Sequence, residues 1–80
     1  MYENIIKNYV NKLTKEHIKS FCIKENVIIS NNEIDLIYYY IKNNWKDIMY
    51  DPNPYLKIAK EKLSKDVYEK ILFLKEKYLK

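Results

Sequence analysis

The chain has 80 residues, enough for one domain that needs most of its apolar side chains for folding. Hydrophobic residues make up 48% and charged residues 32%, which is typical of globular proteins and argues against intrinsic disorder. The formal net charge is +4, and residues 41–80 carry the whole excess, with ten Lys against six acidic residues. Gly is absent, which argues against nucleotide-binding enzymes because phosphate-cradling loops need its backbone freedom.

A single cysteine, Cys22, excludes an internal disulfide and suits a reducing compartment. The first residues lack the basic region, apolar core and cleavage site of a signal peptide. No run approaches the roughly 20 apolar residues that a membrane-spanning helix needs. The sequence therefore predicts a cytoplasmic protein that does not enter a membrane.

Two short amphipathic helices are predicted at the N-terminal end. The first covers residues 2–12, and its inward side chains are Ile6, Tyr9, Val10 and Leu13. Thr14 is the expected N-cap of the second, residues 15–25, whose inward side chains are Ile18, Phe21 and Cys22. Asn26 follows as a left-handed residue that ends this helix in a chain without Gly.

The segment 27–29 is β-branched throughout and predicts an extended connector that lies across the core. Ser30 and Glu33 have the spacing of a capping box and begin the longest helix, which should reach about residue 48. Its inward face is Ile34, Ile37, Tyr38, Ile41, Trp45 and Ile48. Trp45 is expected near the centre of the core.

The strongest helix breaker is the segment 51–54, after which Asn53 is the expected N-cap and Pro54 the first residue of a fourth helix ending near residue 63. Ser64 should cap a final helix, residues 65–79, with Asp66 paired to Lys70. The inward side chains of these two helices are Leu56, Ala59, Leu63, Val67, Ile71, Leu74 and Tyr78. Together the elements predict an all-α, single-domain fold of four or five helices, with an N-terminal helix-extended-helix unit and a C-terminal helical hairpin.

The sequence offers no group of residues suited to catalysis or metal binding. His17 is the single histidine, and it has no Cys or second His at metal-ligand spacing. We therefore expect no enzyme activity, no metal and no cofactor. The function class that remains is binding.

Three consecutive tyrosines, residues 38–40, cannot all face inward, because successive helical residues are about 100° apart around the axis. An outward Tyr39 would share a stripe with lysines, and exposed tyrosines are common in interfaces. The candidate partner-binding residues are Tyr39, Lys42, Lys46 and Tyr50. A protein-protein interaction adaptor is the leading interpretation, as a monomer or as a homodimer.

The lysine-rich second half supports an alternative, a weak nucleic-acid-binding protein that does not distinguish sequences. The absence of Arg argues against base reading, because Arg-to-guanine contacts are the commonest specific ones. The candidate nucleic-acid-binding residues are Lys42, Lys46, Lys57 and Lys60. A lysine surface that reflects only genome composition explains the same residues.

Two resemblances go with these patterns. The Thr14 cap, the segment 27–30 and the following helix resemble SAP- and LEM-like helix-extended-helix modules, which bind DNA or chromatin partners. Asn31 and Asn32 stand where the SAP motif has glycine and lysine, so no DNA-contacting residue of that motif can be assigned to this sequence.

Over nearly the whole length, the chain also resembles the YqfT-like family of small uncharacterised proteins of low-G+C Gram-positive bacteria. The resemblance rests on residues 11–14, residues 28–30, Ile48, Asp51 and the Ser64-capped helix. That resemblance implies no activity.

Overall fold

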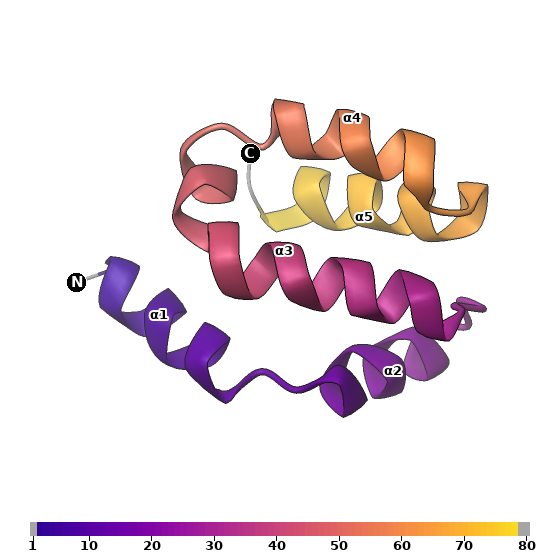
Figure 1. The fold of residues 1–80 in the computed structure, drawn as a ribbon, viewed down its shortest axis with the longest axis horizontal. Coiled ribbons are helices and arrows are strands. Elements are labelled where there is room, and N and C mark those ends of the chain that lie inside the picture. Colours follow the sequence, from indigo (N-terminus) through magenta and orange to yellow (C-terminus); the bar gives the residue numbers. More distant parts are fainter. Residues whose placement is uncertain (1, 79–80) are drawn as a thin grey trace.

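Helix α3 runs through the middle of the molecule, with α1 and α2 along one side and α4 and α5 along the other (Figure 1). The computed structural model describes residues 2–78 and the side chains of residues 3–77. The helices are α1 (Tyr2–Lys12), α2 (Lys15–Lys24), α3 (Asn31–Tyr50), α4 (Asn53–Lys62) and α5 (Lys65–Tyr78). The described residues form no strand. The predicted all-α single domain is confirmed, including its C-terminal hairpin on α3.

Two capping boxes set the starts of α2 and α3. The sequence predicts the Thr14 cap and the box of Ser30 and Glu33, but not the bond that His17 returns to Thr14. The Thr14 hydroxyl oxygen accepts the N–H of His17 at 3.2 Å, and the Thr14 N–H donates to His17 Nδ1 at 3.1 Å. The Ser30 hydroxyl accepts the N–H of Glu33 at 3.2 Å, and the Ser30 N–H donates to Glu33 Oε1 at 3.0 Å. Each box satisfies two N–H groups at a helix start that lack partners within the helix.

Asn26 has a φ of 60°, so it adopts the predicted left-handed conformation. The following residue closes α2, because the Val27 N–H donates to the Cys22 carbonyl at 2.8 Å. The connector that follows lies less deep than predicted. Ile28 is 88% exposed, whereas Val27 and Ile29 are half-buried. Alternate side chains of an extended segment point to opposite sides, so the middle one faces solvent.

The start of α4 differs from the prediction. The helix begins at Asn53, one residue earlier, and the N-cap position falls on Pro52, whose φ of −74° and ψ of −14° are already helical. Asp51 supplies the polar partner, since its Oδ1 accepts the Asn53 N–H at 3.2 Å. The Ser64 cap of α5 is confirmed, because its Oγ accepts the Val67 N–H at 3.4 Å. The predicted end of this helix, residue 79, and the side chain of Tyr78 lie outside what the structure describes.

The core centres on the first half of α3. The buried hydrophobic side chains of the core are Val10, Ile18, Cys22, Ile34, Leu63 and Val67. The prediction that Trp45 lies near the centre is wrong: it is half-buried and follows the residue at which α3 loses helical geometry. Tyr9 is 75% exposed and Phe21 40% exposed, so their predicted inward positions are wrong as well. The inward stripes of α1 and α2 are therefore narrower than the periodicity suggests.

Contacts between residues far apart in sequence tie the helices together. Lys15 Nζ lies 3.0 Å from Asp35 Oδ1 and joins α2 to α3. Lys70 Nζ lies 3.3 Å from Glu25 Oε1, so Lys70 contacts the end of α2 instead of the predicted Asp66.

No helix of the described part of the chain is both long and apolar enough to cross a membrane.

Candidate functional site

Two tyrosines of α3 are strongly exposed. Tyr39 is 58% exposed and Tyr50 is 93% exposed. Lys46 is exposed between them, with its Nζ 5.6 Å from the centre of the Trp45 ring. The outward position predicted for Tyr39 is therefore what the structure has.

Lys42 differs from the other candidate residues because its charge is used inside the fold. Its Nζ donates to the Asn11 carbonyl at 3.1 Å and lies 5.5 Å from the centre of the Tyr38 ring. The side chain is half-buried and satisfies a carbonyl at the C-terminal end of α1. Lys42 thus joins α1 to α3, and it presents less of its charge to solvent than Lys46.

A kink divides the candidate face. Asn44 has a φ of −132° and a ψ of 18°, which lie outside the helical range. Beside it, the Asn43 side-chain amide donates to the Tyr39 carbonyl at 2.8 Å, and a side chain bound to the helical ladder is a known cause of kinks. Figure 1 shows the last turn of α3 set off from the rest of the helix. Tyr39 and Tyr50 therefore belong to two differently directed segments.

Lys57 and Lys60 are exposed on α4. Lys42 instead reaches to the end of α1, which lies on the side of α3 opposite α4 (Figure 1). Lys46, Lys57 and Lys60 remain as exposed cations on α3 and α4.

His17 and Cys22 are the two side chains whose chemistry could serve catalysis or metal binding, and each has a structural explanation. His17 is exposed, and its Nδ1 accepts the hydrogen bond that completes the capping box of α2. Burial raises the pKa of the Cys22 thiol, and the Glu33 carboxylate raises it further, so the thiol stays protonated at neutral pH. Within residues 2–78, no group of three or more His, Cys, Asp or Glu side chains could hold a metal ion.

An aromatic row leads from the α3 face toward α4, and the sequence did not reveal it. The Tyr39 and Tyr40 rings meet edge-to-face with centroids 5.5 Å apart, and the Tyr40 and Tyr55 rings with centroids 5.9 Å apart. The Tyr55 hydroxyl donates to Asp47 Oδ2 at 3.4 Å. Partial desolvation and the Asp47 carboxylate raise the pKa of Tyr55, which keeps its hydroxyl neutral.

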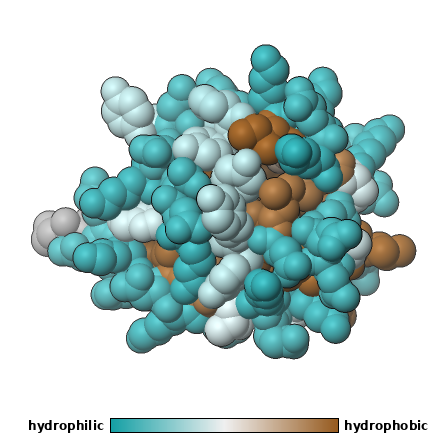
Figure 2. Space-filling model, viewed as in Figure 1, coloured by the Kyte–Doolittle hydropathy of each residue, from teal (hydrophilic) through white to brown (hydrophobic). Residues whose placement is uncertain are grey.

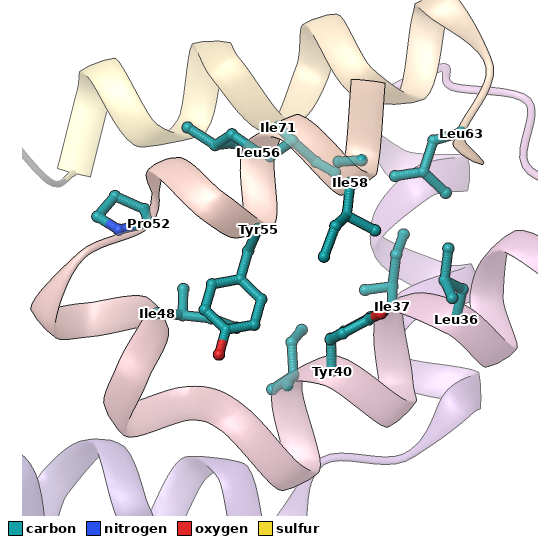
Figure 3. Close-up of a pocket in the computed structure, with 12 residues that line it drawn as sticks. Leu36, Ile37, Tyr40, Ile48, Pro52, Tyr55, Leu56, Ile58, Leu63 and Ile71 are labelled. Carbon is teal, nitrogen blue, oxygen red and sulfur yellow. The ribbon is translucent and has the colours of Figure 1, made fainter. Parts of the chain in front are cut away.

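Tyr40 and Tyr55 also line an apolar cavity between α3 and α4 (Figure 3). Hydrophobic surface reaches the outside of the molecule where α4 meets α3 (Figure 2). The apolar spacing along α3 and α4 signals burial of these residues, but it cannot show that the two helices leave a space between them.

Comparisons of the chain with protein-family models, with curated proteins and with solved structures gave no match.

Proposed function

We propose that this protein is a non-enzymatic adaptor that binds a protein partner through α3, with Tyr39 and Tyr50 as its aromatic anchors. The observation that carries the proposal is the exposure of both rings, 58% and 93%, on one helix of a small domain. Tyrosine is enriched in interfaces because its ring offers a large contact area and its hydroxyl keeps a hydrogen-bonding end. Two exposed rings of this kind support the interpretation of α3 as a surface that a partner protein covers.

The lysines have different roles in this proposal. Lys46 is exposed beside the anchors and is available to an acidic group of the partner. Lys42 is a positioning residue, since its bond to the Asn11 carbonyl holds α1 against the helix that carries Tyr39. The kink at Asn44 gives the two anchors different directions, which suits a partner that follows the bend of α3.

The adaptor proposal is tested by placing a photo-crosslinking amino acid, p-benzoylphenylalanine, at position 39 or 50 in living cells. We expect a discrete covalent adduct with a partner protein from both positions. Tyr9 is the matched control, because it is 75% exposed but lies on α1. The absence of adducts from both α3 positions, or equal adducts from position 9, contradicts the proposal.

The alternative is a nucleic-acid-binding protein that uses Lys46, Lys57 and Lys60, with the half-buried Lys42 contributing less. Its support is the exposure of those three cations, two of them on a helix with three Lys and one acidic residue. Fluorescence anisotropy with duplex DNA, single-stranded DNA and RNA at about 50 and about 150 mM salt separates the candidates, because phosphate contacts weaken steeply with salt. Micromolar binding that weakens strongly at the higher salt favours this alternative over the adaptor.

A further inference from the structure

The cavity between α3 and α4 has a volume of about 240 Å³ and is partly open to solvent. Because the space is partly open, its apolar walls contact water, and a bound apolar molecule would remove that contact. In another protein, an engineered apolar cavity of about 150 Å³ stays dry and binds benzene. By proportion, the space between α3 and α4 has room for a ligand of about ten non-hydrogen atoms.

The lining determines which ligands can enter. Ten of the twelve lining residues are aliphatic or proline, the other two are Tyr40 and Tyr55, and none is charged. The Tyr55 hydroxyl is already bonded to Asp47, outside the set of lining residues. An anionic ligand would lose its hydration without gaining a cation as its partner, whereas a neutral apolar ligand loses little.

The two tyrosine rings give the cavity a preference for a flat ligand. Their planes meet at 71°, and in Figure 3 the Tyr55 ring lies across the space between α3 and α4, with Ile58 beside it. A ring pair with this edge-to-face geometry leaves an edge and a face for a third aromatic ring, an arrangement that favours aromatic over aliphatic ligands of equal size.

We propose that this cavity binds a small, neutral, planar aromatic molecule of about ten non-hydrogen atoms, enclosed by Tyr40, Tyr55 and the aliphatic side chains of α3 and α4. The site is separate from the adaptor proposal, since most of its lining belongs to α4 and α3 residues that do not include Tyr39 or Tyr50. Either proposal can fail without the other.

The test is a titration of the full chain with indole, followed in methyl ¹H–¹³C correlation spectra. We expect saturable shifts of the Leu36, Ile58 and Leu63 methyl signals, and nuclear Overhauser contacts from indole protons to the same methyls. Indole-3-acetate, a negatively charged relative of indole, should bind at least about tenfold more weakly, because its carboxylate finds no cation in the lining and approaches the Asp47 carboxylate beside Tyr55.

Ala59→Met places a longer side chain in the cavity and should weaken indole binding by about tenfold or more. Ser20→Met adds the same side chain at an exposed position of α2 and should leave indole binding unchanged. The Overhauser contacts are measured on the unaltered protein, so they decide the matter even if Ala59→Met does not fold. Ile23 and Ile28 are exposed and do not line the cavity, so contacts only to their methyls would mean surface binding and overturn the proposal. Shifts that grow linearly without saturation, or tight binding by a folded Ala59→Met variant, overturn it as well.

Discussion

The Glu33 carboxylate accepts the backbone N–H of Ser64 at 2.6 Å, across 31 positions of sequence, and joins the start of α5 to the start of α3. Its Oε2 makes this bond, while Oε1 accepts the N–H and the hydroxyl of Ser30 at 3.0 Å each. One carboxylate therefore caps two helices. Partial burial raises the pKa of Glu33, but these hydrogen bonds more than offset that effect and hold the pKa below its ordinary value.

Glu33→Gln should destabilise the protein at neutral pH by about 1 to 2 kcal/mol, because a neutral amide replaces a charged acceptor shared by two helix starts. A carboxylate whose pKa is lowered on folding stabilises the native state above its unfolded pKa, about 4.3. That contribution is lost as the pH falls through the lower pKa of the folded state. Urea unfolding of both proteins from neutral pH into acid should show the difference between them shrinking below about pH 4.

Glu16→Gln is the control for this experiment, since Glu16 is exposed in the first turn of α2. Its effect should stay within about 0.5 kcal/mol at neutral pH. If the Glu33→Gln variant and the parent lose stability in parallel as the pH falls, Glu33 is not the carboxylate responsible.

Lys42→Met should cost about 1 kcal/mol, because it leaves the Asn11 carbonyl without its charged donor and removes a cation from the Tyr38 ring. Hydrogen exchange of the α1 amides should speed up more than that of α4. Lys46→Met is the matched control at an exposed position, with an expected effect within about 0.5 kcal/mol. Equal losses from the two variants would mean that Lys42 does not join α1 to α3.

Ile34→Ala should destabilise the fold by about 2 to 4 kcal/mol, because Ile34 is 5% exposed at the centre of the core and its truncation leaves a cavity. The same substitution at Ile28, which is 88% exposed, should change stability by less than about 0.5 kcal/mol. Denaturant midpoints of the two variants provide the measurement. A small effect at Ile34 would place the core elsewhere.

Asn26→Ala should cost about 1 kcal/mol, because a residue with a β-carbon is strained at a φ of 60° unless its side chain can bond locally. Asn26→Gly should be neutral or slightly stabilising, since Gly adopts this conformation without strain. Thermal unfolding of the pair distinguishes a backbone effect from loss of the Asn side chain. The side chain would be the cause if both variants lost the same stability.

The local parts of the fold could be predicted from the sequence because they depend on neighbouring residues. Thr14 and Ser30 cap helices through partners three residues away, and Asn26 needs only its own backbone preference. The partner of Lys70 could not be predicted, because Glu25 lies 45 positions away and Asp66 was the nearer acid in sequence. Periodicity shows which side of a helix is apolar, but it does not show which helix will cover that side.

The candidate site was predictable to a similar extent. The outward direction of Tyr39 followed from helical geometry, since three consecutive tyrosines cannot share one face. The bond between Lys42 and α1 did not follow, because Asn11 lies 31 positions away in sequence. The kink at Asn44 did not follow either, because apolar spacing carries no sign of the local bond from the Asn43 side chain to the Tyr39 carbonyl. The cavity beside Tyr55 depends on the distance between two packed helices, which no spacing along the chain encodes.

The break at Asn44 gives α3 two parts with different surroundings. The segment before it carries the buried Ile34 and contacts α1 and α2. The turn after it contacts α4, through the hydrogen bond from Tyr55 to Asp47 and through Ile48 in the cavity lining, and it ends in the exposed Tyr50. A single bent helix thus serves as the common support for both halves of the domain.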